Sequence, residues 1–296
     1  MVRHFTKYAK VYIFLAPWLA LFLLFTVLPA LVAIGISFTN FDMVQTPRFV
    51  GFSNYLRMFL DDDIFVKAFS NTMLFAIITG PVSYLLSFVV AWFINDMGRF
   101  WRSALTFLFY SPSLVGNVYI MWMYFFSNDS YGMLNSFLTK WGLINDPIQW
   151  LSDPEYNVWV VVVVVLWMGM GAGFLAFVAG FKQLNQAYFE AAAIDGLGNR
   201  WQELWYITLP QMRPQLLTGA VLSISGAFAI GAQNAALTGM PSTDYSTHTL
   251  LLHIQDYGNL RLEMGYASAV AVVLFAIMIV SWILINKVLN TVSPSD

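Results

Sequence analysis

The chain has 296 residues, of which 59% are hydrophobic and only 10% carry a charge. Soluble domains have about 25% charged residues, so this composition indicates a membrane protein. Cysteine is absent, which excludes disulfides, thiolate metal sites and a cysteine nucleophile. The three histidines, at positions 4, 248 and 253, lack the spacing of a metal site. We therefore expect no metal, no catalytic residue and no cofactor bound by this chain.

The charged residues are spaced so that six long stretches contain none. A charge at the bilayer centre costs at least about 2.5 kcal/mol, so a spanning helix should be free of charges. About 20 apolar residues cross the hydrocarbon core, and each stretch is long enough to do so. We predict an all-α membrane protein with a single transmembrane domain over residues 1–296. Its six transmembrane helices are expected at about 11–38, 69–95, 105–126, 158–181, 215–237 and 266–289.

The loop charges predict the orientation of these helices. An even number of spans places both termini on one side, and the segments on that side hold nine Lys and Arg against five Asp and Glu. The opposite segments hold five Lys and Arg against eleven Asp and Glu. Basic residues concentrate on the cytoplasmic side, so both termini are predicted to be cytoplasmic. The apolar run from Val11 is about twice as long as a signal-peptide core, and we expect a retained anchor.

Proline and glycine mark expected irregularities along the chain. Pro17 and Pro29 should kink the first helix, and Gly80-Pro81 should break the hydrogen-bond ladder of the second. The acidic run Asp61–Asp63 between them is expected to be a solvated loop. A short helix is expected around Met133 to Trp141, in the outer segment after the third span.

Small and polar residues mark the third, fourth and fifth predicted spans. In the fourth span, Gly169, Gly171 and Gly173 follow a run of valines and should allow close helix contact. Amide and phenol side chains at membrane depth are costly unless they have partners, which makes them candidates for a substrate pathway. Interhelical hydrogen bonding is the equal alternative for each of them. The candidates are Asn117, Tyr119, Gln233 and Asn234.

The inner loop 182–214 has helix-favouring residues interrupted at Gly196, Gly198 and Asn199, which predicts helix, turn, helix. It contains Glu190-Ala-Ala-Ala-Ile-Asp-Gly196, followed by Ile207-Thr-Leu-Pro210. These residues resemble the EAA loop of permease subunits of binding-protein-dependent ABC importers. The alanines give a thin helix that can enter a groove on another protein, and Gly196 permits the turn after it.

The resemblance implies that this loop is the coupling helix that docks into the ATPase subunit, with Glu190 as a principal anchor. The residues that inherit the ATPase-coupling role are Glu190, Ala191, Ala192, Asp195 and Gly196. The chain departs from the family pattern in one respect. Ile207 stands eleven positions after Gly196 instead of ten, and we expect the Leu197–Arg200 turn to hold the extra residue.

Further segments resemble the carbohydrate-uptake subgroup, similar to the first permease of maltose-type systems. They are Phe52–Tyr55, Asn71-Thr72, Leu237–Gly239 and Gly265–Ala269. The resemblance implies a type I ABC importer permease fold in the bacterial cytoplasmic membrane, importing a di- or oligosaccharide. The implied partners are two ATPase subunits that use ATP and Mg, a second and different permease subunit, an extracytoplasmic solute-binding protein and membrane lipid. Nucleic acid is not expected as a partner.

Other functions fit the residues less well. The chain lacks a G-x-x-x-x-G-K-[ST] sequence, so it cannot by itself cradle ATP phosphates. An ion-coupled carrier would carry an ionisable residue inside a span, and an intramembrane enzyme would need a nucleophile and base there. The six charge-free stretches contain no Asp, Glu, His, Lys or Arg that could serve in either role. A channel stays open as an alternative, although it leaves the long inner loop without a role.

Overall fold

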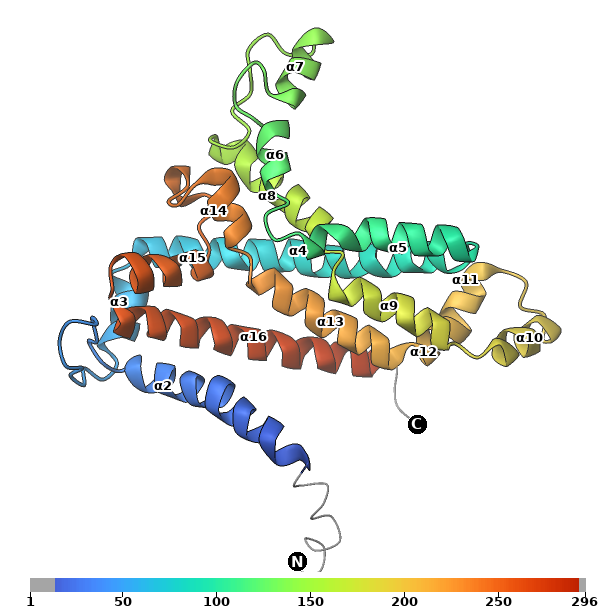
Figure 1. Cartoon of the computed structure of the whole chain (residues 1–296), viewed down its shortest axis with the longest axis horizontal. Coiled ribbons are helices and arrows are strands. Elements are labelled where there is room, and N and C mark those ends of the chain that lie inside the picture. The colour runs from blue at the N-terminus through green and yellow to red at the C-terminus, as the bar shows by residue number, and fades with distance from the viewer. Residues whose placement is uncertain (1–13, 293–296) are drawn as a thin grey trace, which may run out of the picture. The chain divides into compact units, whose positions relative to one another are not determined.

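The computed structural model describes residues 14–292 (Figure 1). Every regular element in that range is a helix, and an isolated antiparallel bridge joins Thr39 to Phe49. The contacts divide the chain into two compact units. The smaller unit comprises residues up to Asp63 and His253–Val273, and the larger comprises Ile64–Leu252 and residues from Leu274 onward. The all-α prediction is confirmed, whereas the predicted start at Val11 and both chain ends lie outside the described residues.

The first helix runs from Phe14 to Ile36 and contains a π-helical stretch, η1, before α2. Pro29 cannot donate a hydrogen bond and its ring crowds the preceding turn, so a wider turn directly before it is the expected response. The elements are η1 (Leu23–Val27), α2 (Leu28–Ile36), α3 (Ser53–Leu60), α4 (Asp63–Asn95), α5 (Arg99–Leu114), α6 (Ile120–Phe125), α7 (Met133–Lys140), α8 (Pro154–Met168), α9 (Ala172–Gln183), α10 (Gln186–Ile194), α11 (Arg200–Glu203), η2 (Leu204–Thr208), α12 (Leu209–Gln211), α13 (Arg213–Phe228), α14 (Ala232–Thr238), η3 (Thr243–Tyr245), α15 (Leu250–Gln255), η4 (Asp256–Leu260) and α16 (Met264–Val292).

The described residues contain four helices that are long and apolar enough to cross a membrane, namely Phe14–Ile36, Asp63–Asn95, Pro154–Gln183 and Met264–Lys287. A fifth is obtained if α13 and α14, bent by 42° at a short break, count as one span. The predicted count of six is therefore not confirmed. The predicted helix 105–126 is divided into α5 and α6, because Gly116 and Asn117, which are weak helix formers, follow Pro112 closely.

In the smaller unit, the segment Phe52–Tyr55 closes the end of the first helix. The Asn54 side chain is buried, and its Nδ2 donates to the backbone carbonyls of Ser37 and Thr39 at 2.8 Å each. The Ser37 hydroxyl also shares a hydrogen bond of 2.8 Å with the Tyr55 hydroxyl. These contacts satisfy carbonyl groups that a helix leaves without partners at its C-terminal end.

Asp62 is buried in the smaller unit, so the expectation of a solvated acidic run is wrong for this residue. Its Oδ2 accepts hydrogen bonds from the hydroxyls of Tyr266 at 2.6 Å and Tyr257 at 3.2 Å. His253 Nε2 lies 3.2 Å from the same oxygen. Burial, followed by the charge of Asp62, raises the pKa of Tyr257, which keeps its hydroxyl protonated and able to donate.

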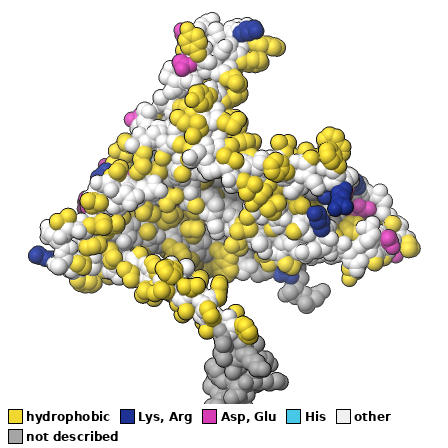
Figure 2. Space-filling model, in the orientation of Figure 1, with side chains coloured by type: hydrophobic (Ala, Val, Ile, Leu, Met, Phe, Trp, Pro, Cys, Tyr) yellow, Lys and Arg dark blue, Asp and Glu magenta, His cyan; other side chains and the backbone are white. Residues whose placement is uncertain are grey.

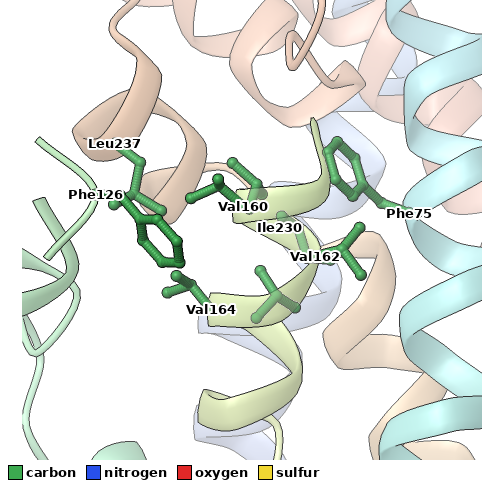
Figure 3. Packing of buried hydrophobic residues seen from close by; sticks show 9 residues of the cluster. Phe75, Phe126, Val160, Val162, Val164, Ile230 and Leu237 are labelled. Carbon is green, nitrogen blue, oxygen red and sulfur yellow. The ribbon is translucent and has the colours of Figure 1, made fainter. Parts of the chain in front are cut away.

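The valine run of α8 forms the centre of a hydrophobic cluster in the larger unit. Val160, Val161, Val162, Val164 and Val165 are all buried. Figure 3 shows Val160, Val162 and Val164 between Phe75 of α4 on one side and Phe126 and Leu237 on the other. The run is helical, as predicted, because it continues without a turn signal for longer than a strand would.

Glycines bring three helices of the larger unit close together. A Cβ on Gly173 of α9 would lie 3.5 Å from the Gly219 carbonyl of α13, so the predicted contact role of Gly173 is confirmed. A Cβ on Gly80 of α4 would lie 3.5 Å from Ala227. α4 continues without interruption through Pro81, so the expected loss of regular structure there is limited to the missing donor of the proline.

Candidate functional site

A cavity of about 340 Å³ lies in the larger unit, between α4, α5, α8, α9, α13 and α14. Its wall combines glycine and apolar residues with a small set of hydroxyl and amide side chains. The polar lining residues are Thr79, Ser83, Ser113, Ser223 and Gln233. None of the lining residues carries a charge. A wall of this kind suits a neutral solute that offers many hydroxyl groups.

Three helix breaks of the larger unit border this cavity, namely those between α5 and α6, between α8 and α9, and between α13 and α14. Gly169 and Gly171, between α8 and α9, line it, as does Ile230 between α13 and α14. Ser113 lines it just before the break between α5 and α6. Irregular backbone at membrane depth is tolerated only where it is buried in protein or lines a cavity. Gly169 is also needed sterically, because a Cβ there would lie 2.5 Å from the Ser83 hydroxyl.

Of the four residues predicted for a substrate pathway, the structure brings only Gln233 to the cavity. Its buried Oε1 has no hydrogen-bond partner among the described residues. Asn234 is buried elsewhere and donates to the Thr247 carbonyl at 2.7 Å. Asn117 accepts a hydrogen bond of 2.8 Å from the Tyr119 hydroxyl, in the interruption between α5 and α6. The hydroxyl residues Thr79, Ser83 and Ser113 were missed, because serine and threonine in apolar helices usually bond to their own backbone.

The loop between α9 and α13 is the second candidate site, and it forms the predicted helix, turn, helix. α10 begins where the Asn185 side chain accepts from the Ala187 amide at 3.0 Å. It ends where Gly196 adopts φ +92°. The Leu197 amide donates to the Ala192 carbonyl at 2.9 Å, which is the hydrogen bond of a Schellman cap. The sequence therefore fixes both ends of this short helix.

α10 presents most of its predicted coupling residues to solvent. Glu190, Ala191 and Asp195 are exposed, and the Ile194 side chain is 86% exposed, whereas Ala192 faces inward and is buried. Figure 2 shows charged side chains at this end of the larger unit and at its α7 end, with hydrophobic and uncharged side chains over the helices between. Exposed apolar and acidic groups on one small helix are suited to a protein partner.

The base of the loop, formed by α11, η2 and α12, is anchored in the larger unit. Arg200 forms an ion pair with Asp96, just beyond the end of α4. The rings of Trp201 and Trp92 are 5.2 Å apart. Leu204 is buried in a hydrophobic cluster with residues of α4 and α9, including Phe88, Ala91, Ile94, Phe174, Phe177 and Phe181.

The loop also contains a π-helical stretch, η2, in which an additional residue fits. A π-helical turn holds one residue more than an α-helical turn, and η2 runs from Leu204 to Thr208, through Ile207. The placement of the residue in the Leu197–Arg200 turn stays a prediction; in that turn the Asn199 side chain accepts from the Trp201 amide at 3.0 Å. The helix keeps Leu204, Ile207 and Thr208 buried in spite of the added length.

Among the described residues, no group of three His, Asp or Glu side chains forms a possible metal site.

Comparisons with known proteins place the chain among transport proteins. A family model described as "Binding-protein-dependent transport system inner membrane component" matches residues 11–291. The probable ABC transporter permease protein YesP of Bacillus subtilis is 30% identical over 90% of this chain and 86% of its own length. The arabinooligosaccharides transport system permease protein AraP of the same organism is 28% identical over 93% and 87%.

A chain of the solved bacterial alginate ABC transporter, in complex with an alginate pentasaccharide-bound periplasmic protein, has a similar fold. The TM-score is 0.78 and the sequence identity is 22%, and the match covers 100% of this chain and 99% of that chain. At this identity the likeness establishes the fold alone.

Replacing Gly196 with alanine should weaken the end of α10. A Cβ added at Gly196 or at Gly198 would meet no atom within 4 Å, but only Gly196 has a positive φ. The Gly196→Ala variant should therefore lose about 1 kcal/mol locally, seen as about fivefold faster amide hydrogen exchange around Leu197. Gly198→Ala is the matched control. Equal exchange rates in the two variants would show that the positive φ is not what ends the helix.

Proposed function

Because this chain belongs to the family of binding-protein-dependent transport system inner membrane components, we propose that it is the permease subunit of an ATP-driven importer for a sugar. It is a multi-pass protein of the cytoplasmic membrane and a transporter subunit, not an enzyme. The exposed, capped helix α10 is the observation that carries the proposal, because a permease without an ATPase site of its own needs such a contact to receive energy.

The substrate that we propose is a di- or oligosaccharide, delivered by an extracytoplasmic binding protein. The cavity beside the helix breaks supports it, since serine, threonine and glutamine side chains match sugar hydroxyls and no charge faces the solute. Relatives named for arabinooligosaccharide and lactose transport are consistent with it. Gln233 is the side chain to which we assign sugar contact. Asn117 and Tyr119 at the α5–α6 break, and Asn234 beside Thr247, keep hydrogen-bonding roles.

For the membrane topology we propose six crossings, with α5 and α6 forming a broken span and both termini in the cytoplasm. The uneven distribution of Lys and Arg supports this orientation. It puts α10 on the cytoplasmic side, where an ATPase can reach it, and α7 on the outer side, where a binding protein can.

The partners that we propose are two ATPase subunits, which use ATP and Mg, and a second, different permease subunit. Glu190, Ala191 and Asp195 would contact the ATPase, because they are exposed on α10. Ala192, which is buried, and Gly196, which ends the helix, would shape the surface that these residues present.

Glu190→Ala should uncouple the permease from its ATPase. In the proposed complex the ATPase covers Glu190, and truncating one partner of such a buried charged contact costs about 2–5 kcal/mol. Binding-protein-stimulated ATP hydrolysis by the reconstituted complex should therefore fall at least about tenfold. Glu155→Ala is the matched control, because Glu155 is an exposed glutamate at the start of α8, far along the chain from the loop. Stimulated hydrolysis that is unchanged by Glu190→Ala would refute the coupling role.

The topology can be tested by introducing one cysteine at a time, because the chain has no native cysteine that would also react. Ser130→Cys, before α7, should react with a membrane-impermeant maleimide in intact cells, since Ser130 is exposed on the proposed outer side. Gln186→Cys, exposed at the start of α10, should react only after the membrane is permeabilised. The reverse pattern would invert the proposed orientation.

Gln233→Leu should impair transport without preventing assembly. The substitution keeps the size of the side chain but removes a hydrogen bond to sugar worth about 0.5–1.5 kcal/mol, which corresponds to a roughly two- to tenfold weaker apparent affinity. Uptake would be measured with the sugar that the binding protein selects in a calorimetric screen. Gln45→Leu, at an exposed position in an outer loop, is the control. An unchanged affinity in Gln233→Leu would remove Gln233 from the pathway.

A further inference from the structure

The loop between α9 and α13 has an exposed tip and an anchored base. The tip is α10, most of whose side chains are exposed. The base is attached by Leu204 and Met212, whose side chains are buried in the hydrophobic cluster with residues of α4 and α9. Two further contacts attach the base next to the turn that follows α10. Arg200 forms the ion pair with Asp96, and the Trp201 ring contacts the Trp92 ring.

α4 connects this base to the cavity. Asp96 directly follows its last residue, and Thr79 and Ser83 of the same helix line the cavity. Asp96 stands thirteen positions after Ser83 in the sequence, which corresponds to about 20 Å along a helix axis. The helix is continuous over this length, so a displacement at its end moves Ser83 as well.

We propose that the Arg200–Asp96 ion pair, together with the Trp92–Trp201 contact, transmits a displacement of α10 into α4 and so to the wall of the cavity. Arg200 and Asp96 are positioning residues, since neither lines the cavity nor belongs to α10. The proposal rests on the proposed coupling function, because it requires that an ATPase displaces α10.

The exposure of the pair separates this role from simple stabilisation. The Arg200 and Asp96 side chains are 60% and 37% exposed, and ion pairs of this kind contribute little to folding. The pair instead joins α11 to the end of α4. Without the pair, α11 can swing away from the end of α4 while Leu204 stays buried, and the movement of α10 is lost before it reaches α4.

A cysteine in the cavity reports this movement without knowledge of the sugar. Ser113 is exposed in the cavity wall, and the chain has no native cysteine, so Ser113→Cys provides a single reactive site. The Ser113→Cys permease, assembled with its partner permease and ATPase, is labelled with N-ethylmaleimide with and without ATP. The labelling rate is read by mass spectrometry from the peptide of this chain that carries the new thiol.

In this background, ATP should change the labelling rate. Asp96→Arg and Arg200→Asp should each reduce the ATP-dependent change by about two- to fivefold, the range over which an exposed ion pair biases an equilibrium, while ATP hydrolysis continues. The double variant, which exchanges the two charges, should restore the change. Arg99→Asp, at an exposed position near Asp96, is the matched charge-reversal control. Asp96→Asn is included in case Asp96→Arg does not assemble.

Two results would overturn the proposal: an ATP-dependent change that persists in both single variants, or a double variant that responds no better than they do. The Glu190→Ala variant distinguishes this failure from failure of the proposed function. If Glu190→Ala leaves both hydrolysis and the labelling change intact, α10 is not the coupling element. If Glu190→Ala abolishes both and the charge variants do not alter labelling, coupling stands and only the ion-pair route is refuted.

Discussion

The main constraint on this chain is that lipid offers no hydrogen bonds to an exposed backbone. Along most of the chain, helices satisfy the backbone hydrogen bonds internally. At the helix breaks the backbone groups need other partners or a cavity. In the larger unit the breaks after α5, α8 and α13 all border one cavity, where serine, threonine and glutamine side chains are also found. Polar side chains and irregular backbone thus share one location, because both need an environment other than lipid.

The second organising feature is the unequal attachment of the loop between α9 and α13. Caps at Asn185 and Gly196 make α10 a stable helix without burying it, so it can meet a partner in a defined shape. The base is fixed by hydrophobic burial of Leu204. The loop therefore joins a tip that is free to meet a partner to a base that is part of the packed helices.

Much of the helical content followed from charge spacing, because the cost of a buried charge acts on every residue of a span. Helix interruptions were missed, because the spacing of charges gives no signal at the uncharged residues Gly116, Gly171 and Ala229, where the helices break. The partners of Asp62 and Arg200 were missed for another reason. Tyr266 is 204 residues from Asp62 in the sequence, and Asp96 is 104 residues before Arg200, so no local pattern connects them. The EAA resemblance located α10, but its exposure and the burial of Ala192 required the fold.

The π-helical stretch η2 has a consequence for the register of this loop. A single-residue insertion in an α-helix rotates every later side chain by about 100°, which would turn a buried face toward solvent. A π-helical turn contains the insertion locally and leaves the register beyond it unchanged. A loop with one residue more between Gly196 and Ile207 can therefore still present the same face to the membrane helices.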